Sequence, residues 1–288
     1  MRNRMDEEKE LKVSFLSKKE YECPVCGARF RKEELLSGGG RLIAGPMTDE
    51  LHRLYEPSAK YGEIFPLVYQ AVVCPECWFA AMDQDFMELG GAGLASAQDD
   101  REGRVKDVKL LFGPLDFSSP RGLAEGAASQ YLVTRCYGYF DKNFSPTIKR
   151  GLSSLRAAWL FDDLAKKSPR QHYDWLALLF RRKAQFLYNE AIRLEQSGKE
   201  TLSAMKSFGP DTDKNYAYEG VLYLCAYLRF KYGPSEPVQR RLSLEDARRT
   251  IAKIFGMGKS SREKPGPLLD HARQIYDTIN KELNESDI

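Results

Sequence analysis

The stretch Cys23-Pro24-Val25-Cys26-Gly27 decides how the N-terminal third of the chain is expected to fold, together with its counterpart Cys74-Pro75-Glu76-Cys77. Two residues between the cysteines let both thiolates of a tight turn point at one ion, and two such turns complete a tetrahedral shell of four sulfurs. A closed shell of this kind leaves no position for a substrate. The pattern predicts one structural Zn²⁺ held by Cys23, Cys26, Cys74 and Cys77.

Two features set this pattern apart from a simple zinc ribbon. Residues 27–73 separate the cysteine pairs, whereas simple ribbons use about 15–20 residues, so the gap must form an insert of its own. Trp78 follows the last cysteine where the first pair has Gly27, and tryptophan does not readily adopt the positive φ that glycine tolerates. We therefore expect the second turn to leave its last cysteine differently. Two redox dithiols, an iron centre or no metal are the alternatives, but the paired motif favours zinc.

Composition shifts divide the chain into three regions. Residues 1–20 are charged and are expected to be a frayed tail, and residues 21–121 are expected to form the zinc-binding module with its insert and a linker. Within the module, residues 66–73 are short, apolar and rich in β-branched and aromatic side chains, which predicts a strand ending on Cys74. Residues 122–288 are expected to form a helical, repeat-like domain.

Amphipathic helices are predicted in series from about residue 122. Apolar residues keep to one helical face in three groups, namely Leu176, Leu179, Ala184, Leu187, Ala191 and Leu194; Val221, Leu222, Cys225 and Leu228; and Leu268, Ala272, Ile275 and Ile279. Tyr216, Gly220 and Tyr223 have the offsets of a tetratricopeptide helix, although Glu219 replaces the usual leucine. The predicted fold class is mainly α: a small N-terminal zinc-ribbon-like module with few short strands, then a tetratricopeptide-like helical-hairpin domain.

Composition and charge are those of a folded protein without a membrane segment. Hydrophobic residues make up 42% of the chain and charged residues 30%. Residues 1–100 hold 12 Lys/Arg against 18 Asp/Glu, a balance of −6, and residues 101–288 hold 32 against 23, a balance of +9. The first 16 residues are too charged for a secretory signal, and six cysteines are too few for a disulfide scaffold. We expect a cytoplasmic protein that does not enter a membrane.

No catalytic motif was found, so no catalytic or cofactor-binding residue is assigned and enzymatic activity is left open, with a non-enzymatic role favoured. The segment 211–215 opens like a calcium loop, but Tyr216 and Leu222 stand where glycine and the bidentate glutamate belong, which excludes it. His52 is near enough in sequence to replace a cysteine ligand, but a surface histidine is the simpler interpretation. Cys136 and Cys225 have apolar neighbours on predicted helices and are interpreted as buried small side chains.

The first cysteine pair, Tyr61, the Pro66-Leu-x-Tyr69 segment and the following V-C-P-x-C-x-F-A-A together resemble the bacterial family called domain of unknown function 2225. The resemblance covers the metal region well and the helices loosely. It implies a bacterial cytosolic protein with an N-terminal zinc-ribbon-like module, tetratricopeptide-like helices and the four cysteines as ligands. No activity is established for that family. Trp78 departs from the glycine commonly expected after the final cysteine.

Two functions follow from these patterns. The first is a non-enzymatic interaction protein, in which the zinc module stabilises the N-terminal fold and a surface between helices receives a protein or peptide partner. The alternative is a nucleic-acid-associated zinc-ribbon protein, which the +9 balance of residues 101–288 permits. The sequence indicates no particular oligomeric state.

Overall fold

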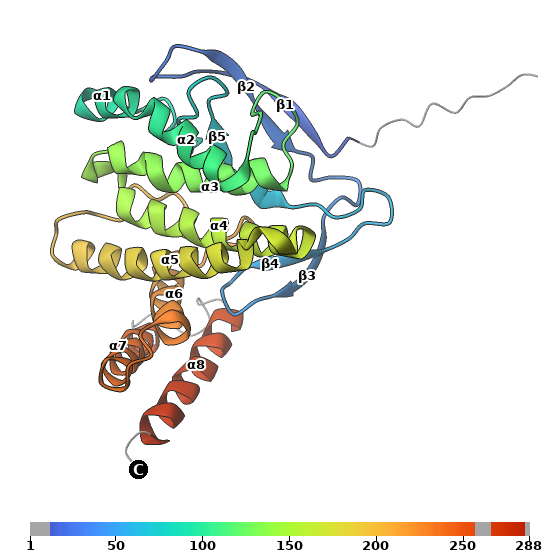
Figure 1. The fold of residues 1–288 in the computed structure, drawn as a ribbon. Coiled ribbons are helices and arrows are strands. Elements are labelled where there is room, and N and C mark those ends of the chain that lie inside the picture. The colour runs from blue at the N-terminus through green and yellow to red at the C-terminus, as the bar shows by residue number, and fades with distance from the viewer. Residues whose placement is uncertain (1–11, 257–265, 286–288) are drawn as a thin grey trace, which may run out of the picture.

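A computed structural model describes residues 12–256 and 266–285 of the chain, with three β-hairpins followed by a stack of helices (Figure 1). The hairpin strands are β1 (Ser14–Glu22), β2 (Arg29–Leu35), β3 (Ile43–Met47), β4 (Arg53–Glu56), β5 (Ala71–Val73) and β6 (Ala80–Met82). The helices are α1 (Gly91–Asp99), α2 (Arg101–Phe112), α3 (Leu123–Cys136), α4 (Pro146–Lys167), α5 (Tyr173–Gln196), α6 (Ala217–Tyr232), α7 (Pro237–Gly256) and α8 (Gly266–Glu285). The predicted class, mainly α with a small strand module, is confirmed.

Each cysteine pair lies in the turn of a hairpin. Strands β1 and β2 pair up to Glu22 and Arg29, which flank the first pair, and β5 and β6 pair up to Val73 and Ala80, which flank the second. Strand β1 begins at Ser14, so residues 14–20 of the predicted 1–20 tail lie in a paired strand and are not a frayed end. The tail prediction for residues 1–11 lies outside the described residues.

The run 66–73, predicted to be one strand, divides into two elements. A single 3-10 turn spans Pro66–Tyr69, and only Ala71–Val73 is strand β5. Proline at the first position of the turn has a fixed φ and no amide hydrogen, so it suits the start of a helical turn. The turn is buried on all sides against α3, where a Cβ added to Gly126 would lie 2.5 Å from a methyl carbon of Val68. The proline at its start and the close packing on α3 therefore favour a helical turn for Pro66–Tyr69.

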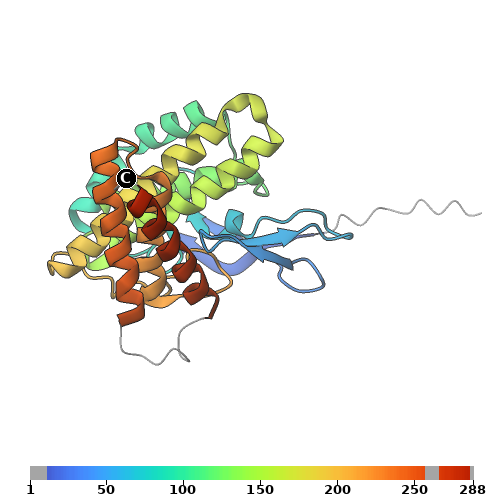
Figure 2. The same ribbon diagram turned by 90° about the horizontal axis from the view of Figure 1, so that it is seen from below.

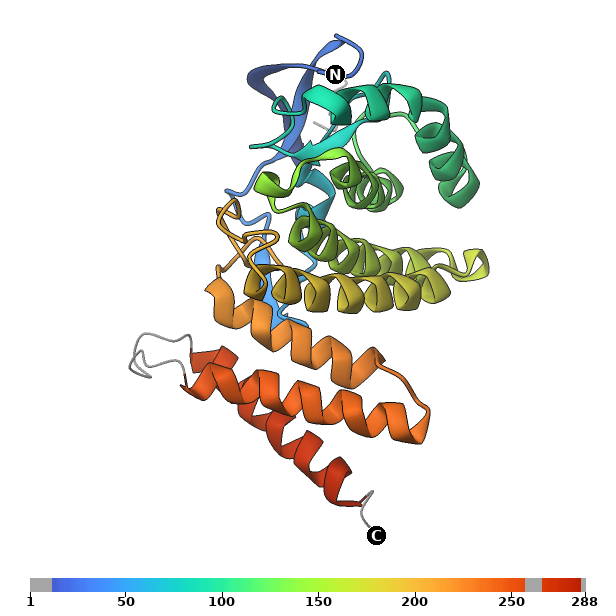
Figure 3. The ribbon, with the colours of Figure 1, turned by 90° about the vertical axis from the view of Figure 1, so that its left-hand side faces the viewer.

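The helices stack in chain order from α3 to α7, with α8 crossing last, and the cysteine-bearing hairpins lie at the α1–α3 end (Figure 3). The predicted apolar faces of α6 and α8 are buried. In α5, Ala184, Leu187 and Ala191 are buried, whereas Leu176, Leu179 and Leu194 are half-buried. None of the helices in the described residues has the length and hydropathy needed to cross a membrane.

Two hydrophobic cores meet at α3. One joins helices α4–α8, and the other surrounds both cysteine pairs and includes Leu132 and Val133 of α3. Ala127 of the same helix belongs to the first core. The predicted boundary between residues 121 and 122 therefore does not separate the two cores, and the predicted linker before it contains the helices α1 and α2. Helix α3 is the seam between the cysteine end and the helical stack.

The middle hairpin, β3–β4, pairs with neither of the others. It lies beside the helical stack, and seen from below the strands gather on one side of the helices (Figure 2). At its turn, Leu51 has φ of 59° and is fully buried in the core of α4–α8. The insert between the cysteine pairs therefore packs on the helices.

Candidate metal centre

The four cysteines predicted as ligands converge on one point. Their sulfur atoms lie within 4.8 Å of one another, with Cys23 Sγ 3.6 Å from Cys77 Sγ and Cys26 Sγ 3.6 Å from Cys74 Sγ. These pairs are far beyond a disulfide bond of about 2.05 Å. A tetrahedral ion with metal–sulfur bonds of about 2.3 Å separates its sulfurs by about 3.8 Å, so the arrangement fits one metal ion. Cys23, Cys74 and Cys77 are buried, and Cys26 is exposed.

The two cysteine turns, which we call the first knuckle (residues 23–28) and the second knuckle (residues 74–79), have the same backbone hydrogen bonds. In the first knuckle, Gly27 N donates to Cys23 O at 2.8 Å, and in the second, Trp78 N donates to Cys74 O at 3.0 Å. Each first cysteine also donates its amide to the carbonyl five residues on, at 2.9 Å in both.

The expectation that Trp78 gives the second knuckle a different exit is wrong. Trp78 has φ of 57°, in the same left-handed region as Gly27 at 75°. Its ring is buried and lies edge-on to Phe117, with 5.4 Å between the ring centroids. Burial of a tryptophan side chain is worth several kcal/mol, more than the roughly 1–2 kcal/mol that the left-handed backbone costs. Packing of the side chain therefore imposes the glycine-like turn.

Three side chains from α1 and α2 donate hydrogen bonds to backbone carbonyls of the knuckles. Gln98 Nε2 of α1 donates to Val25 O in the first knuckle at 3.2 Å, and Arg101 Nη2 of α2 donates to Glu76 O in the second at 2.9 Å. Arg104, fully buried, donates through Nε and Nη2 to Cys77 O at 3.4 and 3.2 Å and through Nη1 to Ala97 O at 2.5 Å. These three residues could not be predicted from the sequence, because bonds from a helix to distant carbonyls have no local sequence signal.

Charge at the centre favours a cation. Hydrogen bonds from the Cys23 and Cys74 thiols lower the pKa of Cys77 to about 2. Hydrogen bonds with Cys74 and Cys77 raise the pKa of Cys23. The lowered pKa favours the thiolate form of Cys77, which is the form that binds a metal. A metal ion takes the place of the remaining protons when it binds, since only deprotonated sulfur is a ligand.

The two other cysteines are inert. Burial raises the pKa of Cys136 and of Cys225 to about 12, so both stay protonated thiols at neutral pH. Their burial agrees with the interpretation from sequence as small core side chains.

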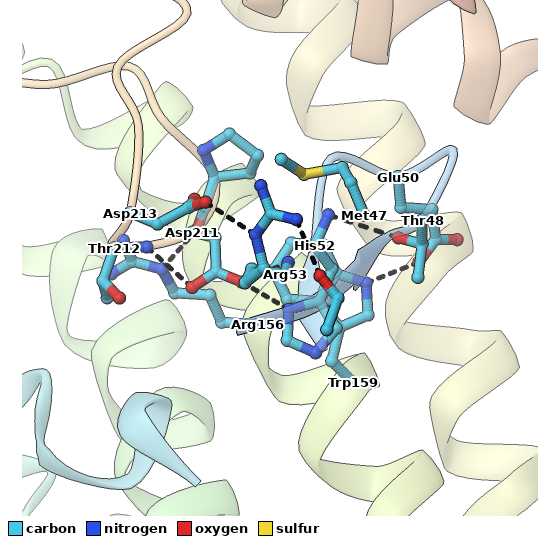
Figure 4. Close-up of polar contacts among 12 residues, drawn as sticks. Met47, Thr48, Glu50, His52, Arg53, Arg156, Trp159, Asp211, Thr212 and Asp213 are labelled. Carbon is cyan, nitrogen blue, oxygen red and sulfur yellow. Dashed lines mark hydrogen bonds and ion pairs between the residues drawn. The ribbon is translucent and has the colours of Figure 1, made fainter. Parts of the chain in front are cut away.

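His52 lies away from the cysteines. Among the described residues, the group that could hold a metal contains only the four cysteines. His52 Nδ1 pairs with Asp211 at 2.5 Å, and its ring stacks on Trp159 with 4.2 Å between centroids (Figure 4). Asp211 also accepts Arg53 N at 2.8 Å, and Asp213 pairs with Arg53 Nε at 2.9 Å. The calcium-like segment 211–215 thus binds the β3–β4 hairpin.

Glu50, beside Leu51 at the tip of that hairpin, is the centre of a buried polar cluster. Its carboxylate accepts Trp159 Nε1 at 2.5 Å, Arg181 Nε at 2.7 Å and the Tyr232 hydroxyl at 2.6 Å. Burial and the nearby Glu50 charge raise the pKa of Tyr232. Every Glu50 oxygen is occupied by protein donors, so this cluster fastens the hairpin to α4, α5 and α6 and offers no free acid or base.

Comparison with known proteins places the chain in a family. A family model described as "Uncharacterized protein conserved in bacteria (DUF2225)" matches residues 16–279. An "Uncharacterized protein" of Borreliella burgdorferi is 42% identical over 273 residues, covering 94% of this chain and 98% of that protein. No solved structure matches the chain significantly. The chain belongs to this bacterial family, as its cysteine motifs suggested.

Proposed function

We propose that this member of the bacterial family is a cytoplasmic interaction protein, in which one structural Zn²⁺ stabilises the hairpin end and the exposed face of α5 binds a protein or peptide partner. Stabilisation by the metal and binding of the partner are assigned to different parts of the molecule. The metal centre supports the fold, and the binding surface lies on the helical stack.

Zinc is proposed because the donor set consists of sulfur alone. Four thiolates in tetrahedral geometry select zinc or an iron–sulfur centre, and both cysteine turns have the short spacing of structural zinc sites. Zn²⁺ with four thiolates has a net charge of about −2. The guanidinium groups of Arg101 and Arg104, bonded to the second knuckle, offset that charge.

The metal proposal is tested by elemental analysis of the protein purified without added metal. We expect about one zinc per chain, and no visible absorption from iron–sulfur charge transfer. One iron per chain, or a folded protein with no metal, would contradict the proposal.

The binding surface is proposed from an apolar stripe on α5. Trp175 is 59% exposed, Leu178 36% and Phe186 64%, and these spacings place the three side chains on one side of the helix. Arg182, also exposed, lies between Leu178 and Phe186 on the same side. Exposed aromatic side chains with an arginine are the composition of interface centres. This stripe is the observation that carries the proposal.

The chemistry of the stripe indicates its partner. Large apolar rings gain most from apolar side chains of a partner, and Arg182 favours a carboxylate beside them. We therefore propose a segment of another protein that is apolar with acidic flanks. Stacked helix pairs of the tetratricopeptide-like kind provide extended surfaces for such segments.

The experiment compares two double variants in a pull-down from bacterial lysate. Trp175→Ser with Phe186→Ser removes the stripe, and Val238→Ser with Leu242→Ser, on α7, removes side chains of similar exposure. We expect partner proteins to be recovered with the wild type and the α7 variant and to be lost with the α5 variant. Circular dichroism checks that both variants fold, and sedimentation tests whether a second copy of the chain is the occupant. Equal recovery with both variants would contradict the proposal.

The nucleic-acid alternative is less well supported by the described residues. Its motivation is the basic balance of the helical part, but several of the arginines there are paired with carboxylates. Arg181 pairs with Glu50 and Asp162, and Arg229 pairs with Asp246. Binding to mixed DNA and RNA that weakens steeply with salt would restore this alternative.

A further inference from the structure

A cavity of about 480 Å³ lies between the cysteine-bearing hairpins and the helical stack. Strands β1 and β2 and the segment after β6 form one wall, and α4 and the loop between α5 and α6 form the other. Binding sites for small molecules have volumes of about 300–1,000 Å³ and often lie where two folding units meet. The cavity has the size and position of a ligand site.

The walls of the cavity are strongly cationic. Lys19, Lys32, Arg156 and Lys206 line it, and Asp83 is its one acidic residue. Four positive charges and one negative charge leave a balance of +3. The other lining residues are neutral and include the polar side chains of Gln84 and Ser207.

Asp83 is already shared among its neighbours. Its carboxylate accepts Lys19 Nζ at 2.8 Å and the Tyr21 hydroxyl at 2.8 Å, and Lys32 Nζ lies 3.7 Å away. Only 10% of the Lys32 side chain is exposed, and burial lowers its pKa. One carboxylate serving two lysines leaves this wall with excess positive charge.

Arg156 faces the cavity from α4 with no carboxylate bonded to it. Its Nε donates to Pro210 O at 2.8 Å, and this is the one hydrogen bond of its side chain in the part of the chain that the structure describes. The acid whose charge acts on Arg156, Asp211, is bonded to His52 and to the Arg53 backbone. Burial lowers the pKa of Arg156, so its charge is held at a cost that an anion would offset.

We infer that this cavity binds a small molecule carrying a diphosphate group, such as a nucleoside diphosphate. A phosphate group carries about −1.5 to −2 charges at neutral pH, so two linked phosphates approach the balance of +3. The free edge of the Arg156 guanidinium offers paired N–H donors to one phosphate, and Lys32 and Lys206 supply point charges from the opposite wall and the loop. Gln84 and Ser207 offer neutral hydrogen bonds to the remainder of the molecule.

The arrangement of the cations favours a small molecule over a nucleic-acid strand. A strand is bound along a groove with a cation for each successive phosphate, whereas these cations converge on one space. Because the walls belong to the two cores, the bound molecule would also tie the cysteine end to the helical stack. Ligand binding should therefore raise the midpoint of thermal unfolding.

Isothermal titration calorimetry with the full chain tests the inference, using ADP, inorganic pyrophosphate and inorganic phosphate as probes. We expect ADP and pyrophosphate to bind more tightly than phosphate. Arg156→Gln should weaken ADP binding by about tenfold or more, because a charged hydrogen-bond donor is lost. Arg150→Gln is the matched control, since Arg150 is also half-buried on α4, with burial lowering its pKa and Nε bonded to Thr134 O at 3.2 Å, but it does not line the cavity.

A second pair of variants does not depend on a buried residue. Lys206→Gln changes an exposed lysine at the cavity and should weaken ADP binding about threefold, whereas Lys199→Gln, exposed near the start of the same loop, should leave it unchanged. The inference is overturned if no probe binds at millimolar concentration, if Arg150→Gln weakens binding as much as Arg156→Gln, or if only a single-stranded oligonucleotide binds.

Discussion

The two knuckles have the same backbone conformation, but different interactions stabilise it. The first uses Gly27, whose missing side chain makes a φ of 75° easy, and nothing lies within 4 Å of where a Cβ would stand. The second uses Trp78 at φ of 57° and buries its ring beside Phe117. The first turn is therefore stabilised by local conformational freedom, and the second by tertiary packing.

The second knuckle is also more buried than the first and accepts more side-chain hydrogen bonds. Cys26 of the first knuckle is exposed, and that knuckle is held by one bond from Gln98. Both cysteines of the second knuckle are fully buried, and Arg101 and Arg104 bond to its carbonyls. Leu51 in the middle hairpin resembles Trp78, since it too is a buried apolar residue at positive φ. At both positions, burial of the side chain offsets the cost of the left-handed backbone.

The largest effect should come from removing a proposed metal ligand in the buried second knuckle. Cys74→Ser should abolish stoichiometric metal and unfold the cysteine end, because the binding energy of a structural zinc, about 10–16 kcal/mol in small zinc peptides, contributes to folding. Cys26→Ser opens an exposed position that water can fill, so it should retain part of the metal. Elemental analysis and amide hydrogen exchange of residues 14–82 measure both. Equal metal loss and equal loss of protection would mean that burial does not distinguish the knuckles.

Removing Arg104 should be the next most damaging change. Arg104→Met leaves the carbonyls of Cys77 and Ala97 without their donor, and the free energy of unfolding should fall by about 3–5 kcal/mol. Arg101→Met removes one exposed bond to Glu76 and should cost less than about 1 kcal/mol. Urea unfolding of both variants measures the difference. A loss below 1 kcal/mol for Arg104→Met would show that the second knuckle does not need this support.

Trp78→Gly tests packing against backbone strain at one position. Losing the buried ring costs about 3–5 kcal/mol, and relief of the left-handed backbone returns about 1–2 kcal/mol, so a net loss of about 1–4 kcal/mol is expected. Chemical denaturation measures the net change. A variant as stable as the wild type would mean that the two terms are equal, and that tryptophan gives the turn no advantage over glycine.

The smallest effect is expected at Gly27. Gly27→Ala meets no neighbouring atom, so it should cost only the backbone term of about 1–2 kcal/mol. Gly38→Ala is the matched control, because Gly38 also has open space around it but no positive φ, and it should change stability by less than about 0.5 kcal/mol. If the two alanine variants are equally stable, the first knuckle does not depend on glycine conformation.

Several features were predictable because their causes are local. The spacing within Cys23–Cys26 and within Cys74–Cys77 specifies tight turns whatever surrounds them. Helical faces such as Leu268, Ala272, Ile275 and Ile279 follow from a repeat of 3.6 residues and are buried in α8. The sequence-based predictions were wrong where tertiary packing overrides local conformational preference, as in the Pro66–Tyr69 turn and at Trp78.

The sequence by itself predicted the four-cysteine cluster, the predominance of helices and the family, since each follows from recognisable motifs or from residues close together in the chain. Only the tertiary structure decided that the middle hairpin packs on the helices through Glu50 and Trp159, that Arg104 supports Cys77, and that four cations line one cavity. The physical reason is sequence separation. Such contacts join residues tens to more than one hundred positions apart, and their energies depend on burial that exists only once the two cores have met.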